Sequence, residues 1–215
     1  MGCTSAGCRI GSAIYAFLLE NSLKLLLLSI LAFILGSLPT GLIVARVKGI
    51  DLKNVGSGNI GATNVLRTTG RLPALITLIG DFSKGVIAVL IARYLGTGIF
   101  FEGIVGLFAI LGHDFSLFLN FRGGKGVATS LGVLTIYSPQ TGLFAIIIWL
   151  MTVLITRYSS LGALVSFGLL PIGALALDSR VKVPVIFLMT VLIFLRHMDN
   201  ISRLLKGTES KIGAS

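Results

Sequence analysis

Two glycine-rich segments of the chain combine residue types that could bind an anion. The first reads NVGSGNIGATNVLR and covers residues 54–67. Glycine permits positive φ angles and a close approach to the main chain, so successive N–H groups in such a segment can surround an anion. A glycine-rich loop alone is weak evidence, and an ordinary tight connection between helices is the alternative. The candidate binding residues here are Gly56, Ser57, Gly58, Asn59, Gly61, Thr63, Asn64 and Arg67.

The second segment reads GHDFSLFLNFRGGKGVAT and covers residues 112–129. It carries Lys125 within a glycine cluster, and one such loop could be only a basic helix start at the membrane interface. Two loops of this kind on one face, each with a cation, favour an anion site instead. His113 beside Asp114 is either a catalytic pair or a structural hydrogen-bonding residue next to an acid. The glycines around the lysine are Gly123, Gly124 and Gly126.

A third group of polar residues follows the last apolar segment of the chain. His197 and Asn200 lie at a helical spacing that places them near one face. We interpret these two as part of the site. For Arg203, Lys206 and Lys211 we prefer the alternative, which is a basic amphipathic tail on anionic lipid.

The composition indicates an all-α integral membrane protein. Of the 215 residues, 54% are hydrophobic and only 12% are charged, whereas soluble domains have about a quarter charged residues. The net charge is +10, but no Lys/Arg run or aromatic-interleaved basic stripe occurs, so we predict the lipid bilayer and not nucleic acid as the partner. Residues 23–215 are expected to form one domain, after a leader of uncertain role at 1–22 that contains Cys3 and Cys8.

Seven hydrophobic helices are predicted to position these residues. A helix needs about 20 apolar residues to cross the hydrocarbon core, so the shorter segments are expected to be short or re-entrant helices. An odd number of crossings puts the termini on opposite sides. With the N-terminus outside, Lys and Arg favour the cytoplasmic side by twelve to five, and all the polar segments lie on that side. The predicted helices are 25–45, 72–93, 100–112, 126–137, 140–156, 161–177 and 183–195.

Two charged residues lie within the second of these helices. Asp81 and Lys84 are three residues apart, and a charge at mid-membrane costs roughly 2.5 to 3.5 kcal/mol, so we expect them to neutralise each other inside the bundle. Such a pair, together with short helices broken by glycine or proline, is also typical of a membrane transporter of an organic phosphate. Against a transporter, no polar segment faces outward to receive an anion.

Four sequence segments carry a resemblance to a known family. They are GSGNIGATNVLR at 56–67, GHDFSLFLNFRGGKGVAT at 112–129, RYSSLGAL at 157–164 and RHMDNISRLLKGTE at 196–209. In this order they closely resemble the motifs of the bacterial acyl-phosphate:glycerol-3-phosphate acyltransferases of the PlsY type. The resemblance covers about residues 31–209, and it departs from the family pattern at Ser116 and Arg122, where proline and lysine are usual.

The resemblance implies a seven-helix enzyme of the bacterial cytoplasmic membrane with its active site on the cytoplasmic side. It implies transfer of a fatty acyl group from acyl phosphate to the 1-hydroxyl of sn-glycerol 3-phosphate, giving lysophosphatidic acid and phosphate. Of the residues implied to contact substrate, we expect Ser57, Lys125 and His197 to be catalytic. The full implied set is Ser57, Thr63, Asn64, Arg67, Lys125, Ser160, His197 and Asn200.

The expected chemistry needs little beyond the chain itself. Acyl phosphate is a mixed anhydride with a good leaving group, so the enzyme mainly has to hold two anions together and bring hydroxyl to carbonyl. We expect backbone N–H groups to stabilise the oxyanion, and an oxygen of the acyl phosphate or His197 to take the proton. The cytoplasmic face has too few carboxylates for a Mg²⁺ site, so we predict no metal and no cofactor.

Overall fold

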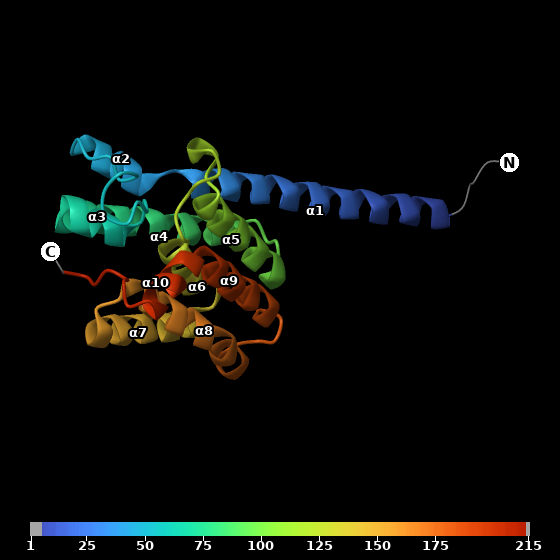
Figure 1. Cartoon of the computed structure of the whole chain (residues 1–215). Helices are drawn as coiled ribbons and strands as arrows, with labels where there is room; N and C mark the ends of the chain where they lie inside the picture. The colour runs from blue at the N-terminus through green and yellow to red at the C-terminus, as the bar shows by residue number, and fades with distance from the viewer. Residues whose placement is uncertain (1–5, 214–215) are drawn as a thin grey trace.

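The computed structural model describes the backbone of residues 6–213 and the side chains of residues 19–213, and all its regular elements there are helical. Cys3 and the side chain of Cys8 lie outside the described residues. An all-helical fold is therefore confirmed for this part of the chain. The helices, shown in Figure 1, are α1 (Ala6–Ser37), α2 (Thr40–Val47), α3 (Ala62–Thr69), α4 (Arg71–Tyr94), α5 (Ile99–Asp114), α6 (Val127–Tyr137), α7 (Pro139–Thr156), α8 (Ser159–Leu177), α9 (Val183–Arg196) and α10 (Met198–Leu205), with a 3₁₀ turn η1 (Leu117–Leu119).

The first predicted helix differs from the structure at both ends. Helix α1 already begins at Ala6, so it continues into the expected leader, and it ends at Ser37 instead of running to residue 45. The break lies at Pro39, because proline has no N–H and disfavours helical backbone at the residue before it. At the break, Leu38 O accepts from Thr40 N at 3.0 Å, and Lys84 Nζ is a second donor to the same carbonyl at 2.5 Å.

Helices occupy all seven predicted apolar segments, but not all are long enough to cross a membrane. Among the described residues, five segments are long and apolar enough, and a sixth qualifies if α9 and α10, bent by 59° at His197, count as one. Helix α6 has 11 residues and, at 1.5 Å per residue, is only about half as long as the roughly 30 Å hydrocarbon core is thick. Seven crossings and the orientation of the termini remain predictions.

The helices form two layers, with the short α6 between them. Helices α1, α4 and α5 lie together, α7, α8 and α9 form the other layer, and α6 packs against α4, α5 and α7 (Figure 1). Glycines allow the closest contacts: a Cβ at Gly36 would lie 2.0 Å from Ala109 O, and one at Gly132 would lie 2.0 Å from Phe82 O. Close backbone approach through small residues is the usual way for membrane helices to associate.

Polar side chains hold the C-terminal end of α6 in place. Arg93 Nη2 donates to Ile136 O at 2.9 Å, and the same guanidinium pairs with Glu102 at 2.9 Å. In the next residues along the chain, Asp178 accepts hydrogen bonds from Ser138 and, at 2.5 Å, from Thr141. These contacts fix the C-terminal end of α6, and its N-terminal end lies at the candidate site.

Candidate active site

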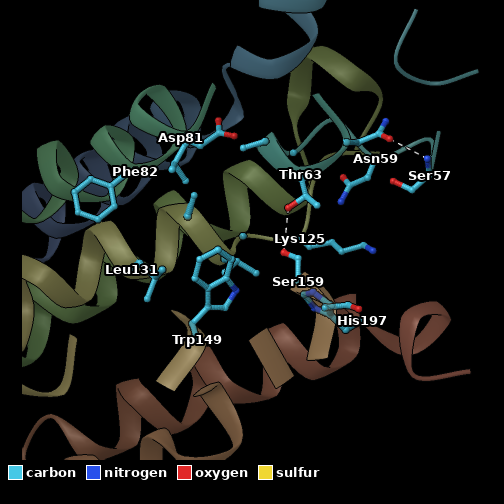
Figure 2. A pocket seen from close by; sticks show the side chains of 18 of the residues that line it. Ser57, Asn59, Thr63, Asp81, Phe82, Lys125, Leu131, Trp149, Ser159 and His197 are labelled. Carbon is cyan, nitrogen blue, oxygen red and sulfur yellow. Dashed lines mark hydrogen bonds between the residues drawn. The ribbon is translucent and has the colours of Figure 1, made fainter. Parts of the chain in front are cut away.

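A cavity of about 450 Å³ lies between the two layers and has a polar and an apolar end. Figure 2 shows Ser57, Asn59, Lys125 and His197 gathered on one side, and Phe82, Leu131 and Trp149 on the other. All the motifs singled out from the sequence contribute to its walls. The predicted site residues that line it are Ser57, Asn59, Gly61, Thr63, Asn64, Arg67, Lys125, Gly126, Ser160, His197 and Asn200.

Four helices of the described chain begin at the polar end. Gly61 to Thr63 start α3, Gly126 to Ala128 start α6, Ser159 and Ser160 start α8, and His197 and Asn200 belong to the start of α10. In this part of the chain none of the four starts has a hydrogen bond from the side chain of its cap residue. Their first N–H groups and positive dipole ends therefore favour anions in the cavity.

Asn64 holds the first glycine-rich segment in place at the cavity wall. Asn64 is buried, its Oδ1 accepts a hydrogen bond from Ser57 N at 2.9 Å, and its Nδ2 donates to Val55 O at 3.1 Å. Gly56 has φ of +62°, and a Cβ there would lie 2.2 Å from Asn64 Oδ1. Gly56 is thus needed for the close packing of the loop on Asn64, and the hydroxyl of Ser57 is the part of that residue left for a ligand.

Helices α3 and α8 are joined across the cavity. Thr63 Oγ1 and Ser159 Oγ lie 3.0 Å apart, a contact drawn as a dashed line in Figure 2. On the same helix α3, Arg67 Nη2 donates to Ser210 O at 2.7 Å. Burial lowers the pKa of the Arg67 guanidinium from its usual value, and Glu209 opposes this shift. Arg67 nevertheless remains a cation, since guanidinium groups are not deprotonated in proteins.

The second glycine-rich segment brings Lys125 to the end of the cavity. Its Nζ donates a hydrogen bond to Asn200 Oδ1 on α10. Burial lowers the pKa of Lys125 to about 8, with Arg203 and Arg196 lowering it further and Glu209 and Asp199 raising it. A lysine held in this way binds an anion strongly while it is protonated, and its charge is sensitive to pH just above neutrality.

His197 lies at the bend between α9 and α10. Its side chain is buried, and Nδ1 is 2.7 Å from Ile193 O. Because a carbonyl can only accept, Nδ1 carries the hydrogen, so Nε2 of a neutral imidazole is an acceptor. The geometry therefore allows His197 to receive a proton from a ligand in the cavity.

Glu209 is a residue of this cavity that the sequence interpretation missed. Its carboxylate accepts from Ser160 Oγ and Asn200 Nδ2 at 2.7 Å each, and from Arg203 Nε at 2.7 Å. Burial opposes its charge, but the hydrogen bonds from these three side chains hold the pKa of the Glu209 carboxyl below its usual value. Arg203 is the counter-ion of Glu209 but is not among the described residues that line the cavity, and the contact of the basic tail with anionic lipid stays a prediction.

Asp81 and Lys84 form the buried pair that the sequence predicted, with Nζ and Oδ1 2.5 Å apart and side chains 3–4% exposed. Asp81 also lines the cavity, and His113 Nδ1 lies 3.6 Å from its Oδ1. His113 and Asp114 do not act on the cavity together: His113 lines it, whereas the Asp114 side chain packs toward Gly126. Asp114 has no hydrogen-bond partner for its carboxylate among the described residues.

The apolar end is a groove that the sequence interpretation did not locate. Leu78 and Ile79 of α4 and Leu150 of α7 are 43–56% exposed at its walls, while α6 lies between these helices. The groove is therefore open toward the lipid. Its apolar lining comprises Leu78, Ile79, Phe82, Val127, Ala128, Leu131, Ile146, Trp149 and Leu150.

Four predicted glycines lie behind the cavity wall and not on it. Gly56 and Gly58 adopt positive φ angles of 62° and 70°, which glycine tolerates without strain. Gly123 and Gly124 pack against the end of α5, where a Cβ would lie about 2 Å from atoms of His113. They shape the loops that carry the binding residues. Among residues 19–213, no cluster of three or more His, Cys, Asp or Glu side chains could hold a metal ion.

Comparison with known proteins agrees with this geometry. The family model described as glycerol-3-phosphate acyltransferase matches residues 26–207. A glycerol-3-phosphate acyltransferase of Geobacter sulfurreducens is 45% identical over 88% of this chain and 98% of the relative. One of Thermus thermophilus is 48% identical over 86% and 93%, and one of a Jannaschia species is 50% identical over 91% and 97%.

Two solved structures share the fold. The crystal structure of PlsY (YgiH), an integral membrane glycerol 3-phosphate acyltransferase in its glycerol 3-phosphate form, aligns with a TM-score of 0.83 and 40% identity. Its lysophosphatidic acid form aligns with a TM-score of 0.81 and 38% identity. Both alignments cover 88% of this chain and 96% of the solved chain.

Proposed function

This chain belongs to the glycerol-3-phosphate acyltransferase family of integral membrane proteins, and we propose that its acyl donor is acyl phosphate. The reaction transfers the acyl group to the 1-hydroxyl of sn-glycerol 3-phosphate and releases lysophosphatidic acid and inorganic phosphate. One observation carries the proposal: a single cavity joins a cationic end, where four helices of the described chain begin, to an apolar groove. Substrates with a phosphate and an acyl chain match both ends.

The polar end suits two phosphates better than one. Arg67 and Lys125 supply fixed and titratable positive charge, and the helix starts supply N–H groups. Solved relatives with glycerol 3-phosphate and with lysophosphatidic acid support a phosphate ligand of this kind. In the proposed complex the acceptor phosphate and the donor phosphate both lie within reach of these groups, which offsets their mutual repulsion.

The apolar end suits the acyl chain of the donor. The groove opens toward the lipid between α4 and α7, so a long-chain donor can enter from the bilayer while glycerol 3-phosphate enters from the aqueous side. This arrangement brings the acyl carbonyl to the junction of the two ends.

In the proposed reaction the 1-hydroxyl oxygen attacks the acyl carbonyl directly. The new ester C–O bond forms, the C–O bond to the donor phosphate breaks, and the hydroxyl proton passes to an oxygen of the leaving phosphate or to His197 Nε2. Ser57, Lys125 and His197 are the proposed catalytic residues. Lys125 and the backbone N–H groups of the helix starts stabilise negative charge on the carbonyl and on the departing phosphate.

The proposed location is the bacterial cytoplasmic membrane, with the polar end of the cavity on the cytoplasmic side. The distribution of Lys and Arg supports this orientation, because basic residues concentrate in loops that stay in the cytoplasm. The polar segments that form the site all fall on that side in this topology. Glycerol 3-phosphate and the released phosphate then exchange with the cytoplasm.

The test is a turnover assay with detergent-purified protein. Acyl phosphate and glycerol 3-phosphate are supplied together and singly, and phosphate release and lysophosphatidic acid formation are measured by colorimetry and mass spectrometry. We expect both products only when both substrates are present, and much less ester when acyl-CoA replaces acyl phosphate. Lys125→Ala should abolish most of the turnover, while the matched change Lys206→Ala at an exposed position should retain it.

Trp149 offers a second measurement because it is the only tryptophan in the chain and lines the cavity. Lysophosphatidic acid should change the emission of this single fluorophore in a saturable manner.

Ester formation from acyl-CoA at the same rate would contradict the proposed donor. Uptake of an organic phosphate into liposomes without any ester formation would favour a transporter and refute the enzyme.

A further inference from the structure

Arg196 holds the loop that carries Lys125, although it is outside the lining of the cavity in the described chain. It is the last residue of α9, and its guanidinium donates to Gly124 O from Nε at 3.2 Å and from Nη2 at 2.8 Å. Nη2 also contacts Gly123 O at 3.5 Å, and the guanidinium lies 5.1 Å from the centre of the Phe115 ring. Two nitrogens of one planar group thus hold the carbonyl side of the loop.

The opposite side of the same loop is held by α5. Gly124 N donates to His113 O at 2.9 Å, and Gly123 N donates to Asp114 O at 3.1 Å. A Cβ at Gly124 would lie 2.1 Å from His113 Nε2, so the loop lies directly on the last turn of α5. The two glycines before Lys125 therefore have their N–H groups held by α5 and their carbonyls contacted by Arg196.

The short segment from Arg196 to Asn200 contacts both the loop and the lysine. Arg196 holds the backbone before Lys125, and Asn200, four residues later, accepts the hydrogen bond from Lys125 Nζ. The chain bends by 59° between these two contacts, at His197. A shift of Arg196 would thus move the loop backbone relative to the residues that meet the lysine side chain.

We propose that Arg196 is a positioning residue that sets the place of Lys125 in the reaction. This inference rests on the proposed function, in which Lys125 acts on the phosphates. Lysine cannot replace Arg196, because an ammonium group lacks the planar fork that reaches two carbonyls and packs on an aromatic ring. The charge of Arg196 also acts on Lys125, since it is one of the groups that lower the pKa of the lysine.

The first experiment is a double-mutant cycle in the purified full-length protein. Arg196→Gln alone should lower kcat/KM for glycerol 3-phosphate by about tenfold to hundredfold, the range of a lost charge-assisted hydrogen bond. If Arg196 acts through Lys125, the double variant R196Q/K125A should be no slower than K125A. Losses that multiply in the double variant would overturn the proposal. Lys206→Gln removes the same charge from an exposed position and should stay near wild type.

The second experiment separates geometry from charge. Arg196→Lys retains the charge but not the fork, so its activity should fall while the alkaline limb of its pH profile stays where the wild-type limb lies. Arg196→Gln should move that limb to higher pH, because a positive charge next to Lys125 is removed. A merely structural role would lower the unfolding temperature of both variants without moving the limb, and that result would contradict a positioning role.

A third measurement does not depend on turnover. Labelling of Lys125 by an amine-reactive reagent is followed against pH by peptide mass spectrometry, with Lys206 of the same molecule as the internal reference. The midpoint for Lys125 should rise in R196Q and stay in place in R196K. If the wild type forms no ester from acyl phosphate, the proposed function is wrong; labelling of Lys125 that is unchanged in both rate and midpoint in R196Q would refute the positioning role in either case.

Discussion

Raising the pH through the range just above neutrality should lower kcat/KM for glycerol 3-phosphate. Burial lowers the pKa of Lys125 to about 8, so its positive charge is present below this pH and is lost above it. The protonated fraction falls from about nine-tenths near pH 7 to about one-tenth near pH 9, and kcat/KM should fall roughly tenfold with it. The substrate does not add to this change, because a phosphate monoester has its second pKa near 6 and is already dianionic.

The groups around Lys125 decide the sign and the position of this limb. Arg203 and Arg196 lower the pKa of the lysine after burial, whereas Glu209 and Asp199 raise it. A bound phosphate adds negative charge, which favours the protonated amine. The limb should therefore appear in kcat/KM, which reports the free enzyme, and lie at higher pH in kcat, which reports the complex.

The assay is steady-state turnover in detergent at constant ionic strength, because screening by salt also weakens anion binding. Lys125→Arg is the matched control, since arginine stays protonated throughout and its profile should lose the limb even if its rate is lower. A wild-type profile that stays flat to about pH 9.5, where a lysine with pKa of about 8 is almost fully neutral, would refute the assignment. A limb that persists in the arginine variant would assign it to another group.

Three further predictions concern the groove, the packing and the topology. Leu131→Trp should fill part of the groove floor and lower kcat/KM for long-chain acyl phosphates far more than for short-chain ones, measured by phosphate release. Gly36→Ala should destabilise the fold by about 1 to 3 kcal/mol, because the new Cβ lies 2.0 Å from a carbonyl of α5, while Gly168→Ala, with its nearest atoms at 3.4 Å, should unfold near the wild-type temperature. In a variant without Cys3 and Cys8, the substitutions Arg180→Cys and Lys206→Cys are introduced one at a time. In intact spheroplasts, an impermeant thiol reagent should label the cysteine at position 180 and not the one at position 206.

Controls make these outcomes decisive. Ile172→Trp places the same indole on an outward face of α8, where the residue is 66% exposed, and should leave the chain-length preference unchanged. If the two tryptophan variants changed the chain-length preference equally, the groove would not be the site that binds the acyl chain. Equal thermal stability of both glycine variants would contradict the close contact of α1 with α5. Labelling at Lys206 before membrane rupture would reverse the proposed topology.

The binding loops could be predicted because their residue types have few other uses next to a membrane span. Lys125 within a glycine cluster and Arg67 after another are unusual in so apolar a chain, and both line the cavity. Helical spacing and the family resemblance both predict His197 and Asn200 at the site, and both are buried there. Polar residues that a membrane protein retains in apolar surroundings are thus readable from sequence.

Other parts of the site depend on distances that a sequence does not contain. Glu209 follows the end of α10 in a basic tail, so its residue type does not distinguish it from an exposed acid; the signal that could have identified it is its place as the last residue of the motif at 196–209 that carries the family resemblance. Its partners Ser160 and Asn200 are 49 and 9 residues away. The contact of Arg196 with Gly124 spans 72 residues and involves a backbone carbonyl, which every residue carries.

The groove could not be predicted for a different reason. Leu78 and Ile79 in the groove and Leu75 and Ile76 one turn earlier on α4 are alike in sequence, and all four are exposed. In a bilayer both lipid-facing and groove-lining positions are apolar, so hydrophobicity does not separate them. The break of α1 was predictable, since the rule that ended a helix before Pro139 applies equally to Pro39.

Lys84 shows a second use for a charged residue within an apolar segment. Its ammonium has two partners, the carboxylate of Asp81 and the carbonyl of Leu38 at the interrupted end of α1. Where proline interrupts a buried helix, the carbonyl groups at the break need donors, and lipid supplies none. Leu38 O also accepts from Thr40 N at 3.0 Å, so the ammonium of Lys84 is a second donor at the break that Pro39 makes, more than a span away in the sequence. Charged residues inside apolar segments can mark the repair of an interrupted neighbour as well as a pathway for ions.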